Sequence, residues 1–136
     1  MTFQINNIRR SYQENQSLEK EYLDVLTNIE CDFILEIDRQ KILSVEGWNL
    51  IEFLDQLMKW KNDDMTTSFL YDCMDSDENL FDLNKQQDGF HFNSSWQEKR
   101  VGRTLSRHEI MDFTERLKTD TINKVRRTFK VDLTAI

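Results

Sequence analysis

The clearest pattern in the chain is an alternation of apolar and polar residues that begins at residue 29. One side of an extended strand over this stretch would carry five apolar residues, Ile29, Cys31, Phe33, Leu35 and Ile37. The other side would carry Glu30, Asp32, Ile34, Glu36 and Asp38. The alternation therefore predicts a strand with one buried face and one face that is mostly in contact with water.

A second strand and a helix are expected to follow with almost no linker. Arg39 and Gln40 can form a tight turn into the apolar run 41–45, and Gly47 interrupts the pattern before a helix begins near Leu50. Asn49 is a good helix N-cap, and Glu52 stands where a helix-start carboxylate reaches back. The helix carries one apolar stripe, formed by Leu50, Phe53, Leu54, Leu57 and Met58. Residues 29–61 are thus predicted to be a hairpin covered by a helix.

The flanking elements are predicted from shorter patterns. Residues 3–8 fit an edge strand, and residues 17–27 fit a short helix capped by Ser17. Three strand-like runs read as an antiparallel meander joined by short turns. They are 67–74, a run that starts at 80–83 and ends at the turn 87–89, and 90–96. Ser106 and Glu109 form a capping box that predicts a helix from about 107 to 127.

This order of elements favours the α+β class. We expect an antiparallel, meander-like β-sheet of five to six strands, covered on one face by two main α-helices and the short N-terminal helix. With 136 residues, no proline and three glycines, the sequence has no linker signal, so residues 1–136 are expected to form a single domain. The longest apolar runs are three residues, which predicts a soluble, cytoplasmic protein. Cys31 and Cys73 are expected to be buried free thiols.

Few residues are candidates for catalysis or for metal binding. The sequence contains no Gly-rich phosphate loop, nucleophile elbow, His-Glu-x-x-His run or Cys-x-x-Cys pair, and so predicts neither an enzyme nor a cofactor. An enzymatic or ligand-binding alternative would need a pocket between sheet and helices at which four side chains converge, those of His91, Tyr71, Trp96 and Asp82. The acids of residues 72–78 could attract a hard cation, but they lack the EF-hand spacing, and a solvated turn is the better interpretation.

Charge distribution is the strongest indication of function. The formal net charge is −7, and residues 63–88 contain eight acids against the single base Lys85. We predict that seven of these acids form a partner-binding face: Asp63, Asp64, Asp72, Asp75, Asp77, Glu78 and Asp82. Such a face repels nucleic-acid phosphates and attracts basic proteins, although ordinary solubility is an alternative explanation. A basic cluster near the carboxyl end, Lys124, Arg126, Arg127 and Lys130, is expected from the helix dipole.

Several segments carry a resemblance to a known group of proteins. Residues 28–32, the central helix with its Leu and Trp residues, residues 95–98, and the opening of the final helix at Leu105, Ser106 and Glu109 resemble small, uncharacterised proteins of Bacillus-type bacteria. Some small acidic proteins of that kind are immunity proteins that bind and block a toxin, so the resemblance implies a binding role. The sequence therefore predicts a non-catalytic acidic protein, such as an immunity or inhibitor protein, that docks a basic toxin or nuclease. Binding to nucleic acid or membranes is not expected.

The assembly state depends on two opposing features. The meander of residues 67–97 should leave a sheet edge open to pairing with another chain, whereas the acidic turns of two copies would repel each other. We therefore predict a monomer or a weak homodimer.

Overall fold

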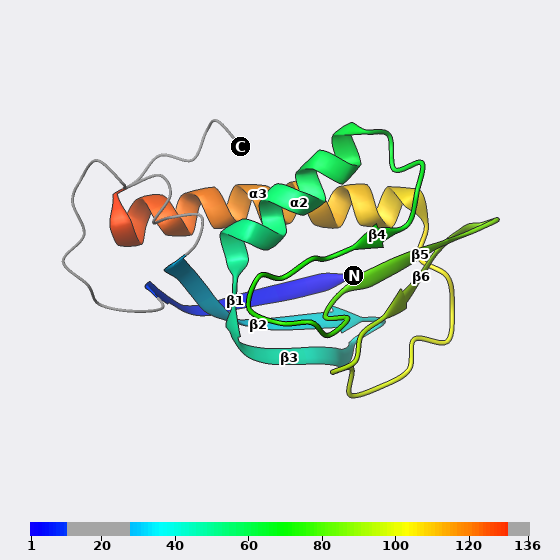
Figure 1. Ribbon diagram of the computed structural model, residues 1–136, viewed down its shortest axis with the longest axis horizontal. Helices are drawn as coiled ribbons and strands as arrows, with labels where there is room; N and C mark the ends of the chain where they lie inside the picture. Colours follow the sequence, from blue (N-terminus) through cyan, green and yellow to red (C-terminus); the bar gives the residue numbers. More distant parts are fainter. Residues whose placement is uncertain (11–27, 131–136) are drawn as a thin grey trace.

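The computed structural model describes residues 1–10 and 28–130 (Figure 1). In chain order the elements are β1 (Thr2–Arg10), β2 (Ile29–Ile37), β3 (Gln40–Trp48), α2 (Leu50–Asn62), β4 (Phe69–Leu70), β5 (Asp82–Gln86), β6 (Gly89–Asn93) and α3 (Arg107–Phe129). The predicted α+β class with antiparallel strands and two main helices is confirmed. The short helix expected over residues 17–27 lies outside the described residues.

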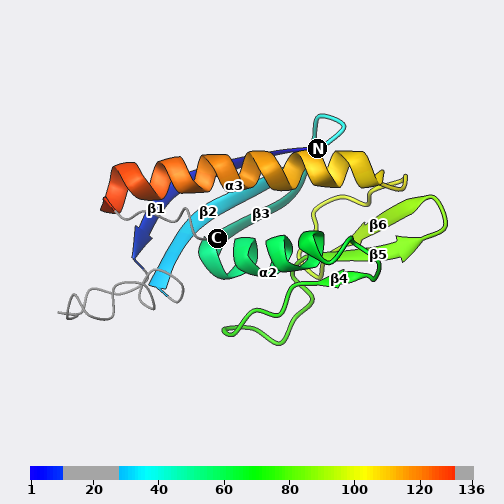
Figure 2. The same ribbon diagram turned by 90° about the horizontal axis from the view of Figure 1, so that it is seen from above.

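The first sheet has the strand order β1-β2-β3, and both pairings are antiparallel. The apolar side of β2 is buried along its whole length, and none of its five apolar residues is more than 2% exposed. The turn between β2 and β3 consists of Asp38 and Arg39, both at positive φ, so it lies one residue earlier than predicted. Helices α2 and α3 both lie over the same face of this sheet (Figures 1 and 2).

The remaining strands form a second antiparallel sheet, ordered β4-β5-β6, instead of extending the first one. The expectation of one sheet with five to six strands is therefore corrected to two sheets of three strands. The strand predicted over residues 67–74 is confined to Phe69 and Leu70. Beyond Leu70 the Tyr71 N–H still donates to the carbonyl oxygen of Phe81 at 3.1 Å, and side chains of α2 then bond the backbone groups of Asp72 and Met74.

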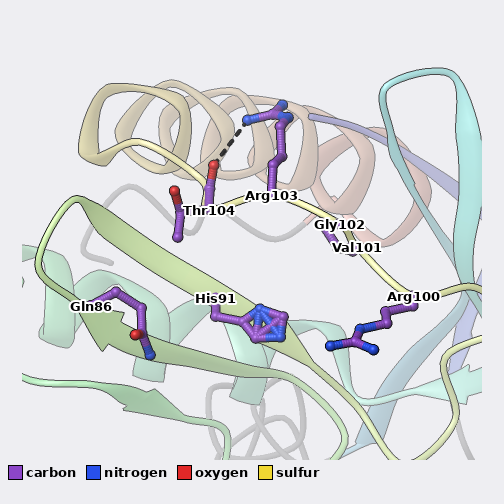
Figure 3. Close-up of a pocket in the computed structure, with 7 residues that line it drawn as sticks. All are labelled: Gln86, His91, Arg100, Val101, Gly102, Arg103 and Thr104. Atoms are coloured by element: carbon purple, nitrogen blue, oxygen red, sulfur yellow. Dashed lines mark hydrogen bonds between the residues drawn. The ribbon is translucent and has the colours of Figure 1, made fainter.

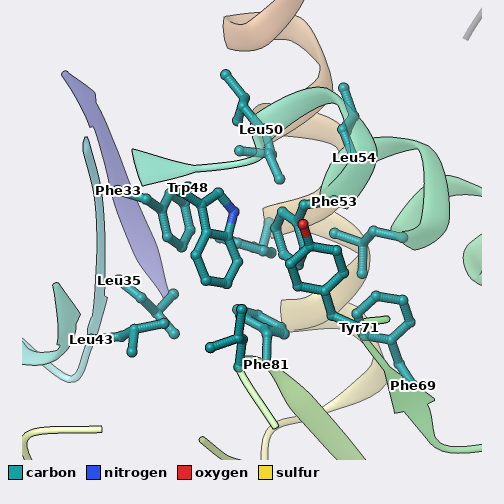
Figure 4. Packing of buried hydrophobic residues seen from close by; sticks show 14 of the residues in the cluster. Phe33, Leu35, Leu43, Trp48, Leu50, Phe53, Leu54, Phe69, Tyr71 and Phe81 are labelled. Atoms are coloured by element: carbon teal, nitrogen blue, oxygen red, sulfur yellow. The ribbon is translucent and has the colours of Figure 1, made fainter. Parts of the chain in front are cut away.

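An aromatic cluster joins the two sheets and the helices (Figure 4). Phe33 stacks on Trp48 with 5.1 Å between ring centroids, and Phe53 meets Phe81 at 4.8 Å. Phe81 in turn stacks against Phe113 of α3 at 6.2 Å. Offset and edge-on contacts of this kind stabilise a core beyond the effect of burial alone. The cluster fixes the start of α2 against the end of β3.

Other expectations concern the cysteines and the last helix. Cys31 and Cys73 are both free and buried, as predicted. The capping box at the start of α3 is also confirmed, because Ser106 accepts from the backbone of Glu109 and Glu109 accepts from that of Ser106. Within residues 1–10 and 28–130, no helix is long and apolar enough to cross a membrane.

Candidate binding site

The side chains of two α2 residues and of the N-cap residue Asn49 hold the segment after β4 in place. Asn49, Glu52 and Gln56 follow one another at helical spacing, so they lie along one side of the helix. Gln56 makes two hydrogen bonds with the backbone of Asp72, donating to its carbonyl oxygen at 2.7 Å and accepting from its N–H at 2.9 Å. Glu52 accepts from the backbone N–H of Met74 at 3.2 Å. The segment is thereby fixed through its backbone, and we call residues 72–78 the acidic loop.

Asn49 completes this attachment instead of capping the helix. Its side chain makes no capping hydrogen bond. The amide nitrogen donates to Oδ2 of Asp75 at 2.9 Å and also lies 3.4 Å from the sulfur of Cys73. The expected reach of Glu52 back to the helix start is likewise replaced by long-range contacts, since its carboxylate accepts from the Tyr71 hydroxyl at 2.8 Å. Both residues therefore position the acidic loop.

A small cavity of about 130 Å³ lies where the end of β3, the start of α2 and the acidic loop meet. On one side it is lined by β3 and by Asn49, the N-cap residue of α2; the β3 residues are Val45, Glu46, Gly47 and Trp48. The opposite wall comprises Tyr71, Cys73, Asp75, Ser76, Leu80 and Trp96. Trp96 is 45% exposed, and its indole N–H donates to the carboxylate of Glu78. The cavity thus combines aromatic walls with carboxylates.

Two aromatic residues of this cavity carry polar groups in a mostly apolar setting. Trp48 is 1% exposed, and its Nε1 has no hydrogen-bond partner among the residues that the structure describes. In Figure 4 this nitrogen lies on the side of the ring that faces Tyr71, and the two ring centroids are 5.3 Å apart. Burial, followed by hydrogen bonds to Cys73 and Glu52, raises the pKa of the Tyr71 hydroxyl. The phenol therefore stays protonated and acts as a donor to Glu52.

The structure separates the seven acids predicted to form one face. Asp72, Asp75, Asp77 and Glu78 are all exposed on the acidic loop. Asp63 and Asp64 follow α2 at its opposite end, where Asp64 lies 4.0 Å from Arg107. Asp82 is only 5% exposed, and its burial raises the pKa of the carboxyl group. Asp82 is therefore not part of an accessible acidic face, because its strand is covered on that side.

A second, wider pocket of about 420 Å³ lies between β5, β6 and the segment before α3 (Figure 3). It is lined by Gln86, His91, Arg100, Val101, Gly102, Arg103 and Thr104. Arg103 is already engaged, since its guanidinium bonds both Asp38 and Glu109 at distances from 2.8 to 3.0 Å. His91 lies in this pocket, whereas Tyr71 and Trp96 line the smaller cavity. The four side chains of the enzymatic alternative consequently do not converge.

No group of three or more His, Cys, Asp or Glu side chains within the two described ranges is arranged to hold a metal ion. The acids of the acidic loop instead point to water and to neighbouring donors such as Asn49 and Trp96. The sequence did not indicate that Glu46 lines the cavity. It predicted only helix-capping roles for Asn49 and Glu52, and not their contacts with the acidic loop. The signal that could have found the attachment is the polar side of α2, on which Gln56 continues the spacing of the other two.

Residues 1–127 match the model of a protein family described as a domain of unknown function, DUF7878. The chain belongs to this family. No curated protein and no solved structure shows significant similarity to the chain. Any role for this DUF7878 member has therefore to be argued from its own residues.

Proposed function

We propose that this DUF7878 protein is a non-catalytic binding protein whose acidic loop docks a basic surface of another protein. The observation that carries the proposal is the acidic loop itself, in which four exposed carboxylates are presented on a backbone fixed by α2. A fixed loop loses little conformational entropy when it binds, so its charges contribute more of their interaction to affinity.

The surroundings of the acidic loop support a protein partner. Met74 is 65% exposed within the loop, and Trp96 is 45% exposed beside it. Aromatic and Met side chains are enriched at protein interfaces, where apolar contact supplies affinity and charges supply orientation and rate. The nearest bases in the sequence, Lys61 and Lys85, lie outside the loop. None of the loop's four carboxylates forms an ion pair with a base of residues 1–10 or 28–130.

An immunity or inhibitor protein that blocks a basic toxin or nuclease in the cytoplasm is the finer role that we propose. The net charge of −7 supports this role, because a basic enzyme would be attracted to the protein over several ångströms before contact. For the protein alone, we propose a monomer or weak homodimer, which sedimentation at physiological salt measures.

The test compares two variants of equal charge. The loop variant carries Asp75→Asn, Asp77→Asn and Glu78→Gln, and the control carries Asp63→Asn, Asp64→Asn and Asp88→Asn; each changes the net charge from −7 to −4. Asparagine at 75 keeps an oxygen that can accept from Asn49. Partners are captured from the source organism with the wild type, identified by mass spectrometry, and their affinities measured for all three proteins over a range of salt concentrations.

The loop variant is expected to bind at least about tenfold more weakly at low salt, since three charge pairs of roughly 0.5 kcal/mol each are lost. Its affinity should also depend less on salt than that of the wild type. Equal binding by all three proteins, or an equal loss in the loop variant and the control, would refute docking through the acidic loop.

A further inference from the structure

The cavity beside the acidic loop is too small for a cofactor or a nucleotide. Pockets for drug-sized ligands usually measure about 300–1,000 Å³, whereas this one measures about 130 Å³. That is the size of the end of one side chain.

The charged residues around the cavity determine which kind of side chain it can bind. Asp75 and Glu46 both line it, and its lining contains no base from the described part of the chain. Glu46 is exposed and is in none of the ion pairs formed among residues 1–10 and 28–130. The carboxylates therefore favour a cationic group at this position.

The walls of the cavity suit the apolar stem of that group. Trp48, Tyr71, Trp96 and Leu80 present apolar surface to it. Trp48 also contributes a buried N–H donor without a partner among the described residues. A buried donor of this kind calls for an acceptor, which an ordered water supplies and an ammonium group does not. Aromatic faces also attract cations, most strongly when water is excluded.

We propose that the cavity receives one lysine side chain of the protein partner, with its ammonium group held by Asp75 and Glu46. A water molecule that accepts from Trp48 can occupy the remaining space. Lysine is favoured over arginine because one oxygen of Asp75 is already bonded to Asn49. A guanidinium prefers both oxygens of a carboxylate, whereas an ammonium is a point charge that needs only single contacts.

The inference rests on the proposed function, and it can be tested without the partner. The probe is Nα-acetyl-lysine N-methylamide, added to ¹⁵N-labelled protein while the indole N–H signals of the three tryptophans are followed by NMR. Saturating shifts are expected for Trp48 and Trp96, with a dissociation constant on the order of millimolar for so small a ligand. Trp60 is the internal control, because its Nε1 donates to the carbonyl oxygen of Thr67, away from the cavity.

Matched probes and variants establish the chemistry. The norleucine analogue of the probe has an uncharged apolar side chain and should give no saturating shift, and the arginine analogue should bind more weakly than the lysine probe. Asp75→Asn should weaken the lysine probe about fivefold, the value of one charge pair near water, while Asp63→Asn should leave it unchanged.

Several results would overturn the assignment: no saturation at Trp48 and Trp96, equal response to the norleucine analogue, or tighter binding of the arginine analogue. If free n-butylammonium binds but the lysine probe does not, the cavity takes small amines and not a partner's lysine. The proposed function is judged separately, since the acidic loop can lose its partner on substitution even when the cavity binds no lysine.

Discussion

Asn49 allows a sharp test of how the acidic loop is attached, because two roles of this residue predict opposite effects. If Asn49 stabilises α2 as an N-cap, serine and aspartate should replace it with little loss, since all three are good caps. If it holds the acidic loop through Asp75, as the 2.9 Å contact indicates, serine is too short and aspartate brings a second carboxylate against the first.

The expected size of the effect follows from that contact. A hydrogen bond to a charged group contributes about 1.5–3 kcal/mol, and the lower end applies because Asp75 is exposed. Asn49→Ser should therefore lower the free energy of unfolding by about 1.5 kcal/mol, which corresponds to a Tm lower by roughly 5 °C. Asn49→Asp should cost about 2 kcal/mol or more, because the new carboxylate repels Asp75.

Urea denaturation followed by tryptophan fluorescence measures these changes, and amide hydrogen exchange shows whether the acidic loop opens first. A double-mutant cycle isolates the contact, since Asn49→Ser should have little further effect in an Asp75→Ala background. Wild-type stability for both the serine and the aspartate variant would show that Asn49 acts as a cap and that the loop is held by other residues.

Three further predictions concern the stability and reactivity of the scaffold. Hydrogen bonds from Arg103 lower the pKa of Glu109 from 4.5 to about 2. Between these two values the unfolded chain binds more protons than the folded protein, so folding becomes less favourable as the pH falls. In denaturation curves the wild type should therefore be more stable than Arg103→Ala above pH 4.5, and this difference should disappear toward pH 2. Burial raises the pKa of Cys31 to about 12, so this thiol should stay unmodified by a maleimide at neutral pH in mass spectra until denaturant is added. Gly89→Ala would place a Cβ atom 2.3 Å from a backbone oxygen at φ +147°, and a loss of roughly 3 kcal/mol is expected in urea denaturation; Gly102→Ala, which meets no atom within 4 Å, should be neutral.

The elements predicted correctly are those that depend on local sequence. The alternation in β2 and the capping box of α3 determine their structures through neighbouring residues, and both are confirmed. The segment after β4 shows the limit of this reasoning. Phe69, Tyr71 and Cys73 alternate with exposed residues and are all buried, as a strand would require. Alternation predicts which side of an extended chain is buried, but not which groups form hydrogen bonds with its backbone. Here the backbone of Asp72 and Met74 bonds side chains of helix α2.

The candidate site was only partly predictable for the same reason. Exposed acids on a polar turn can be recognised from composition, and the acids of residues 72–78 are indeed exposed. The cavity beside them brings together residues as far apart as Glu46 and Trp96, and no periodic pattern links such positions. Asp82 was predicted to be exposed because acidic residues surround it in the sequence. Its strand instead pairs within the second sheet, where the side chain is buried.

At Asp72 and Met74 the attachment of the acidic loop separates the chemistry of the surface from the stability of the fold, unlike at Asp75, whose side chain bonds Asn49. Gln56 and Glu52 bond main-chain atoms of Asp72 and Met74, atoms that every non-proline residue possesses. Replacing the side chains at these two positions alters what the surface presents while leaving the bonds that hold it intact. New binding preferences can therefore arise by single substitutions at Asp72 or Met74 while the path of the loop stays the same.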